Sequence, residues 1–134
     1  MLVDTDVLID VALDRRPHSE AAVRLLERLE RGPRSAFFAW HSASNFYYLV
    51  APTRGGAEAR AFIADLIQFM AIAPTDTDAL RYAASLPMKD FEDAMQVAAA
   101  RACGATHIVT RNVKDFERSP IPAITPEAAL RELF

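Results

Sequence analysis

Residues 89–116 constrain the fold more than any other stretch, because they place a helix, a turn, a strand and a polar loop in direct succession. Gly104 lies where a left-handed residue commonly ends a helix, and residues 107–109 form a short apolar strand. Residues 110–115 leave the carboxyl end of that strand. A helix followed by a strand is half of a parallel α/β unit, which binds ligands at the carboxyl ends of its strands. The apolar stripe expected on the helix comprises Phe91, Met95, Ala98, Ala99 and Ala102.

The rest of the chain repeats this alternation of short apolar runs and helical periods. The alternation predicts an α/β fold with a parallel sheet covered on both faces, in one domain spanning residues 1–134. Ser42 and Asn45 suggest a cap and its partner at the start of a helix, and Thr75 is expected to cap a later one. The expected strands cover residues 1–3, 35–39, 71–73, 107–109 and 123–125. The expected helices include residues 19–31, 43–50 closed by Pro52, 75–86, and a last one starting at Pro126.

Composition limits the classes of function. No apolar run reaches the ~18 residues that a bilayer span needs, and acids interrupt the apolar start of the chain, so neither a membrane segment nor a signal peptide is expected. A single cysteine, Cys103, suits a reducing cytoplasm. The net charge of −3 is unusual for a protein that holds nucleic acid by bulk charge. A polyanion site would therefore be local, or a bound cation would supply positive charge.

Acidic side chains fall at three separated places where one site could form. Asp4 follows the first strand, Asp93 opens a helix with Asp90 three residues before it, and Asp115 follows a later strand with Asn112. Two ionised carboxylates about 5 Å apart repel by roughly 3 kcal/mol at an effective dielectric near 20. A fold tolerates that repulsion by raising pKa values or by binding a cation. A structural alternative is that Asp90 caps the helix while Asp93 favours its first turn.

The ligand types indicate which cation would bind. Oxygen donors without a cluster of Cys or His suit Mg²⁺ or Mn²⁺ rather than zinc. Such an ion can activate water and stabilise a phosphoryl transition state. His41, near the expected start of a helix, is interpreted as a satisfied polar group, although histidine is often chosen for acid–base catalysis.

Three motifs resemble those of the PIN domain family. They are Val3-Asp-Thr-Asp-Val-Leu-Ile-Asp10, Asp90-Phe-Glu-Asp-Ala-Met-Gln96 and Ile108-Val-Thr-Arg-Asn-Val-Lys-Asp-Phe116, and they span nearly the whole chain. The resemblance implies a three-layer sandwich with a central parallel sheet of four or five short strands. It also implies a metal-dependent ribonuclease, commonly the toxin of a VapBC-type toxin–antitoxin pair. Frequent homodimers and inhibition by a cognate antitoxin protein belong to the same expectation.

The resemblance assigns roles residue by residue. Asp4 matches the first acid of the family, and Asp93 matches the acid that precedes Ala in the helix motif. Asn112 stands where many members have an acid, and Asp115 matches the second acid of that loop. Asn45 stands where members usually have Glu. The two Asn residues remove two charges from the pattern, which would weaken metal binding.

The remaining assignments concern the edge of the site. Asp90 adds one charge back on the helical face that carries Asp93. Ser42 lies where the family commonly has a small hydroxyl residue and is assigned to substrate binding. Arg111 and Lys114 lie beside the acids, where they would hold RNA phosphates. The metal ligands expected from the resemblance are Asp4, Asp93 and Asp115, with Asn112, Asp90 and Asn45 as direct or water-mediated ligands.

Two other functions remain open from the sequence. Asp4-Thr-Asp-Val7 after a strand also fits the Asp-x-Asp-x-Thr/Val pattern of HAD phosphatases, with Asp4 as the nucleophile, but that pattern leaves the loop at 110–116 unexplained. A degenerate PIN domain that only binds a partner is the other possibility, suggested by Asn45 and Asn112.

Overall fold

The computed structural model describes residues 1–134 and contains one parallel sheet of five strands in the order β3-β2-β1-β4-β5. Each strand has two residues: β1 Leu2–Val3, β2 Phe37–Phe38, β3 Ala71–Ile72, β4 Ile108–Val109 and β5 Ala123–Ile124. All four pairings are parallel, which confirms the predicted sheet. The central strand β1 lies beside β4 with Val3 opposite Val109.

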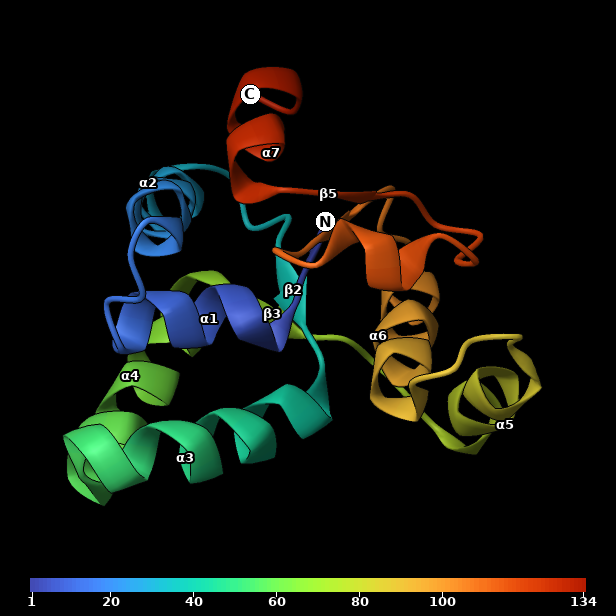
Figure 1. The fold of residues 1–134 in the computed structure, drawn as a ribbon, viewed down its shortest axis with the longest axis horizontal. Coiled ribbons are helices and arrows are strands. Elements are labelled where there is room, and N and C mark those ends of the chain that lie inside the picture. Colours follow the sequence, from blue (N-terminus) through green and yellow to red (C-terminus); the bar gives the residue numbers. More distant parts are fainter.

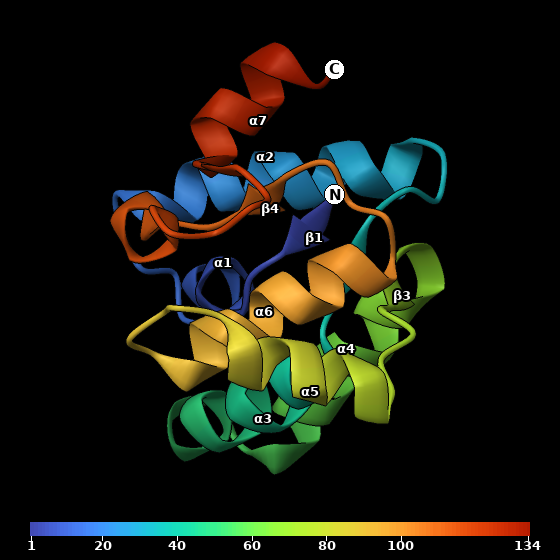
Figure 2. The ribbon, with the colours of Figure 1, turned by 90° about the vertical axis from the view of Figure 1, so that its right-hand side faces the viewer.

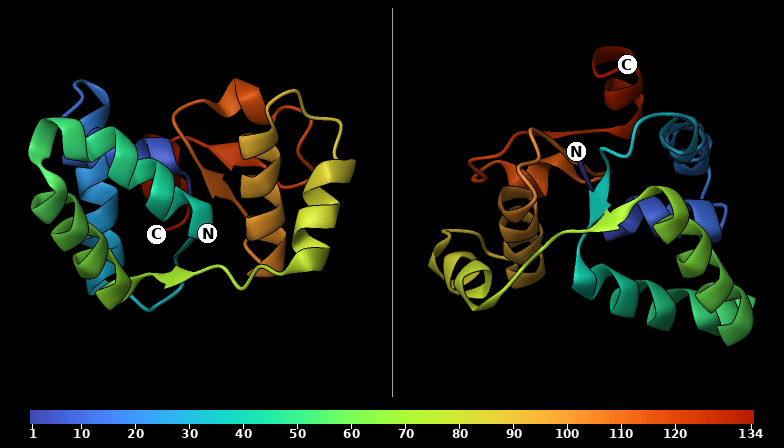
Figure 3. Two further views of the ribbon diagram at one scale, coloured as in Figure 1. Left: turned by 90° about the horizontal axis from the view of Figure 1, so that it is seen from below. Right: turned by 180° about the vertical axis from the view of Figure 1, so that it is seen from behind.

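Seven α-helices and one 3-10 helix surround the sheet. They are α1 Thr5–Ala12, α2 His18–Arg31, α3 Trp40–Arg54, α4 Gly56–Phe69, α5 Thr77–Ser85, α6 Phe91–Ala102, η1 Val113–Phe116 and α7 Pro126–Glu132. Helices α1 to α4 lie on one side of the sheet in Figure 1, and α5 and α6 lie on the other. Figure 2 shows α5 packed along α6, and Figure 3 shows the same two groups of helices from below and from behind.

The two groups of helices enclose separate cores, because successive side chains of a strand point to opposite faces. Val3 packs with α1, α2, α3 and α4 in the larger core, which also contains Phe38 and Phe46. Leu2, the preceding residue of β1, packs instead with Val97 of α6 and with Ile108. This central strand therefore ties both cores together directly before Asp4.

Some helix boundaries differ from the prediction. α3 begins at Trp40 after an N-cap residue, Ala39, that makes no side-chain capping bond, so the predicted capping by Ser42 and Asn45 is wrong. α3 also continues through Pro52 to Gly55, whose φ of 89° suits glycine. Packing of α3 against α1 and α4 outweighs the single backbone hydrogen bond that proline removes.

Two details at the starts of α5 and α6 correct or resolve the prediction. Asp76, not Thr75, caps α5 by accepting a hydrogen bond from the Ala79 N–H. Asp90 caps α6 through the Asp93 N–H, as the structural alternative proposed. Gly104 has a φ of 65°, which confirms its predicted left-handed conformation.

The predicted apolar stripe of α6 is only partly correct. Phe91 is half exposed and Ala102 is exposed, whereas Ala98 and Ala99 are buried as expected. α6 packs against the sheet on one side and against α5 on the other, so its buried surface is wider than a single stripe. None of the helices combines the length and the apolar character that crossing a bilayer requires.

Candidate active site

Asp4 and Thr110 meet at the carboxyl ends of the two central strands. Each residue directly follows its strand, β1 or β4, and the two strands are paired neighbours. The Thr110 hydroxyl donates a hydrogen bond of 2.8 Å to Asp4 Oδ2. The other oxygen, Asp4 Oδ1, accepts the Thr5 N–H at 2.7 Å and so caps α1. Both oxygens of Asp4 are thus held by hydrogen bonds, one from a backbone N–H and one from a side-chain hydroxyl.

The Asp4 carboxyl group is buried, with 6% of the residue exposed. This burial raises the pKa of Asp4 well above its ordinary value, and the nearby carboxylates of Asp6 and Glu92 raise it further. The hydrogen bonds from Thr110 and Thr5 act in the opposite direction but do not compensate. An ionised Asp4 therefore needs positive charge close by.

Asp6 supports the loop that follows β4. Its Oδ2 accepts hydrogen bonds from the Arg111 N–H at 3.1 Å and the Asn112 side-chain amide at 3.0 Å, and it lies 3.1 Å from the Thr110 hydroxyl oxygen. These contacts hold residues 110–112 beside Asp4 across more than a hundred positions of sequence. Asp6 therefore supports the loop that carries Thr110, Arg111 and Asn112.

Arg111 pairs with an acid instead of extending freely toward solvent. Its Nη1 lies 2.7 Å from Asp10 Oδ1, and the Asp10 side chain is only 2% exposed. Removing one partner of such a buried pair leaves an uncompensated charge, which is costly. The ion pair fixes the loop to α1, so Arg111 is less available to hold RNA phosphates than the sequence predicts.

The N-terminus of α6 carries a second group of acids. Carboxylate oxygens of Asp90, Glu92 and Asp93 lie within 4.8 Å of one another. Burial raises the pKa of Asp93 to about 7, with further contributions from the carboxylates of Asp90, Glu92 and Asp115. Asp93 and Asp115 therefore share one electrostatic environment although they are far apart in the chain.

A groove of about 520 Å³ joins this part of α6 to η1. Its lining is almost entirely polar and mixes acids with cations. The lining residues are Met88, Lys89, Asp90, Asp93, Lys114, Asp115, Glu117 and Arg118. The groove thus brings cationic side chains to the edge of an acidic centre, as a site for a phosphodiester requires.

The acids expected to converge influence one another's pKa values. The Glu92 carboxylate contributes to the raised pKa of Asp4, and the carboxylates of Glu92 and Asp115 contribute to the raised pKa of Asp93. Asn112 lies in the same loop as Asp115, with its side chain bonded to Asp6. Lys114 lines the groove beside Asp115.

The two site residues expected from α3, Asn45 and Ser42, do not line the groove. Asn45 is half-buried and is not among the residues that line the groove. Ser42 is fully buried, with its hydroxyl oxygen 2.7 Å from Thr5 Oγ1 and 3.0 Å from Gln96 Nε2. In this structure Ser42 therefore lies beneath the site, where it packs against the start of α1 and has no surface to offer a substrate.

The sequence reasoning missed Glu92 and Gln96. Glu92 lies one position before Asp93, off the helical face shared by Asp90 and Asp93, so the face argument excluded it. Gln96 follows Glu92 by four positions, and its Nε2 donates to Glu92 Oε1 at 2.9 Å. The spacing of four between an acid and an amide was the signal that could have found this pair.

The donor set fits a hard divalent cation. All the clustered groups offer oxygen, there is no Cys among them, and two of the acids have raised pKa values that a cation would reverse. Oxygen-only sites of this kind suit Mg²⁺ or Mn²⁺.

Residues 1–114 match the PIN domain family, so the chain belongs to that family. No curated protein is similar in sequence at a significant level.

Solved structures of toxin–antitoxin proteins have the same fold. VapBC2 from Rickettsia felis, bound to a DNA fragment from its promoter, matches with a TM-score of 0.70 and 16% identity over 93% of this chain and 98% of that one. The DNA-bound VapBC from Salmonella typhimurium gives 0.68 and 18% over 93% and 96%. VapC20 from Mycobacterium tuberculosis, a sarcin–ricin loop cleaving toxin, gives 0.64 and 18% over 80% and 85%. At these identities the likeness establishes the fold.

Proposed function

We propose that this PIN domain is a divalent-metal-dependent endoribonuclease that hydrolyses RNA phosphodiester bonds, and that it is the toxin of a toxin–antitoxin pair. The observation that carries the proposal is the groove that Asp90 and Asp93 of α6 share with Asp115 of η1, together with cationic side chains. Asp4 is linked to this cluster through the Glu92 carboxylate, which contributes to the raised pKa of Asp4. Family membership and the likeness to VapC toxins support the same function.

Asp4, Asp93 and Asp115 would hold Mg²⁺ or Mn²⁺, with Asp90, Asn112 and Asn45 as further or water-mediated ligands. When bound, such an ion lowers the pKa of water and offsets the charge that develops on the phosphoryl group. Thr110 orients Asp4 by its hydrogen bond.

The cations at the groove would hold the RNA. Lys114, with Lys89 and Arg118 on the same groove, would bind the phosphates that flank the scissile bond. The net charge of −3 makes this local arrangement necessary, because the molecule as a whole repels a polyanion.

A cleavage assay tests the proposal. VapC20 cleaves the sarcin–ricin loop, so an end-labelled hairpin of that sequence is a suitable first substrate beside a longer structured RNA. We expect site-specific cleavage in Mn²⁺ or Mg²⁺ and none in EDTA. Asp115→Asn should reduce cleavage by at least about 100-fold, the loss typical of one strong electrostatic contact to the transition state. Asp65→Asn makes the same chemical change on the exposed surface of α4 and should cleave like wild type. Equal cleavage by the Asp115→Asn and Asp65→Asn variants would reject the assigned site.

The two other functions give different results. A binding-only PIN domain, suggested by the neutral Asn45 and Asn112, should show no stabilisation by Mn²⁺ that depends on Asp93. A HAD-type phosphatase would form an aspartyl-phosphate on Asp4, which mass spectrometry of a trapped sample would detect. The PIN family match extends to residue 114 and so covers most of the loop at 110–116 that the phosphatase alternative leaves unexplained.

We also propose that the chain works in the cytoplasm as a homodimer that a cognate antitoxin inhibits. Relatives of this fold were solved as VapBC assemblies. A small upstream gene for a DNA-binding protein would support the pairing with an antitoxin.

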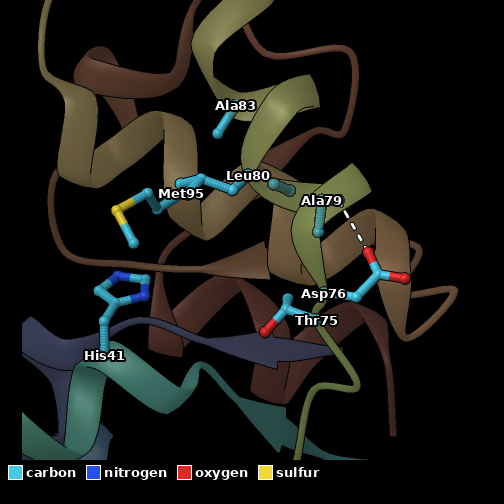
Figure 4. Close-up of a pocket in the computed structure, with 8 residues that line it drawn as sticks. His41, Thr75, Asp76, Ala79, Leu80, Ala83 and Met95 are labelled. Carbon is cyan, nitrogen blue, oxygen red and sulfur yellow. Dashed lines mark hydrogen bonds between the residues drawn. The ribbon is translucent and has the colours of Figure 1, made fainter.

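An apolar hollow of about 210 Å³ between α5, α6 and the start of α3 is the proposed dimer contact. Figure 4 shows Met95, Leu80 and His41 around this hollow. Leu80 is 51% exposed and Trp40, next to His41 in the chain, is 73% exposed. Apolar surface left open in this way is typical of protein–protein contacts.

Leu80→Glu tests the dimer contact. Light scattering after size exclusion should give about twice the 14.8 kDa chain mass for wild type and about one chain mass for Leu80→Glu, because the new charge would be buried at the contact. Ile67→Glu, a similar change on exposed α4, should stay dimeric. A wild-type monomer at tens of micromolar would contradict the proposal.

A further inference from the structure

Glu92 is held on one of its two carboxylate oxygens. His41 Nε2 and Gln96 Nε2 each lie 2.9 Å from Glu92 Oε1. An ionised carboxylate only accepts hydrogen bonds, so the His41 ring must donate through Nε2. Neither contact involves Oε2, and the Glu92 side chain is about one-third exposed. Oε1 is therefore anchored by two donors, whereas Oε2 makes neither of these contacts, and the Glu92 carboxylate also interacts with the neighbouring Asp93 carboxyl group.

The anchor of Glu92 continues into the interior. Gln96 is completely buried, and its Nε2 also lies 3.1 Å from Thr5 Oγ1 and 3.0 Å from Ser42 Oγ. Thr5 directly follows Asp4 and donates the N–H that fixes it. The contacts therefore join α6 to the starts of α1 and α3, and they set the position of Glu92 relative to Asp4.

Glu92 lies beside two of the proposed metal ligands. A Glu92 oxygen lies within 4.8 Å of ligand oxygens of Asp90 and Asp93. Asn45 is neutral where the resemblance to PIN domains leads us to expect Glu, so α3 offers no charge to the site. Asp90 has one oxygen in a structural contact, because its Oδ1 caps α6 through the Asp93 N–H.

We propose that Glu92 supplies, through Oε2, the carboxylate toward the divalent ion that Asn45 cannot supply, with His41 and Gln96 as positioning residues. This inference rests on the proposed metal-dependent function. The negative charge then comes from Glu92 of α6 and not from α3. Ser42 and Thr5 contact Gln96 and so help to position Glu92.

Mn²⁺ binding to the whole protein tests the assignment without an activity assay. We would measure the dissociation constant by calorimetry, and the shift of the melting temperature with added Mn²⁺. Glu92→Gln keeps the shape and the acceptor for His41 and Gln96 but removes the charge, and it should weaken Mn²⁺ binding about 10- to 100-fold. Glu27→Gln makes the same change on exposed α2 and should bind Mn²⁺ like wild type.

A second variant separates positioning from general stability. His41→Asn removes one bond to Glu92 Oε1 but leaves the carboxylate, so Mn²⁺ affinity should fall by less than in Glu92→Gln. Melting curves in EDTA report whether each variant folds. If Glu92→Gln does not fold, the His41→Asn variant decides: a folded His41→Asn protein that binds Mn²⁺ like wild type overturns the inference. Mn²⁺ affinity of a folded Glu92→Gln within twofold of wild type also overturns it. A wild-type protein that does not bind Mn²⁺ instead overturns the proposed function.

Discussion

Asp93→Asn is expected to abolish RNA cleavage and, in the same protein, to raise the melting temperature of the metal-free form at pH 8. Cleavage should fall by at least about 100-fold, because a ligand charge is lost where transition-state charge must be stabilised. Stability should rise because Asn is neutral among Asp90, Glu92 and Asp115, which together with burial raise the pKa of Asp93. Opposite changes of activity and stability are typical of a site built for function.

The pH dependence follows from the sign of this shift. The pKa of Asp93 is about 7 in the folded protein, against an ordinary value of 3.8 for an aspartate side chain. Between these values the folded state binds a proton that the unfolded state has released, so stability falls as pH rises from about 4 to 7. The raised pKa of Asp4 acts in the same direction. The raised pKa values of Asp6 and Asp10 do so as well. Asp93→Asn removes one of these contributions and should flatten the profile.

Melting curves in EDTA at pH 5 and pH 8 measure this effect. The wild-type protein should lose more melting temperature between the two values than Asp93→Asn, and added Mn²⁺ should recover part of the loss at pH 8. Asp65→Asn serves as the matched control and should follow wild type. A melting temperature of Asp93→Asn below that of wild type at pH 8 in EDTA would contradict the claim that charge repulsion at Asp93 destabilises the metal-free protein.

Gln96→Leu is expected to cost about 2–4 kcal/mol of folding free energy. The substitution conserves side-chain size roughly, but it leaves Thr5, Ser42 and Glu92 without the amide that lies 2.9 to 3.1 Å from them. A lost hydrogen bond to a neutral group costs about 1 kcal/mol, and one to a charged group about 1.5–3. For a domain of this size we expect the melting temperature to fall by about 10 °C.

Urea unfolding of Gln96→Leu and Gln68→Leu measures the cost directly. Gln68 is exposed on α4, so the same chemical change there should alter stability by less than about 0.5 kcal/mol. Equal midpoints for the two variants would mean that the buried amide contacts contribute nothing to folding.

Local sequence patterns were sufficient to predict the sheet and the position of Asp4. Short apolar runs between helical segments predicted the parallel strands. The turn at Gly104 was predicted because glycine readily adopts the left-handed conformation that commonly ends a helix. Asp4 and Thr110 meet because β1 and β4 are neighbours in the sheet, a strand order that the alternation of strands and helices does not fix.

Contacts between distant helices could not be predicted in the same way. The His41–Glu92 contact spans 51 positions and the Thr5–Ser42 contact spans 37. No local pattern distinguishes these residues from a cap or a surface acid. The path of α3 through Pro52 was missed for a related reason, because tertiary packing there overrides the local preference of proline.

The way Asp4 is held has a consequence for experiments on this protein. Its two oxygens accept hydrogen bonds from the Thr5 amide and the Thr110 hydroxyl, so the folded chain itself fixes the orientation of the carboxyl group. The same anchoring makes Asp4 an ambiguous target for mutagenesis, since its loss would unravel the first turn of α1 together with the chemistry. The loss of activity in an Asp4 variant could therefore come from altered folding or from altered catalysis. Variants of Asp93 and Asp115 allow these two causes to be distinguished.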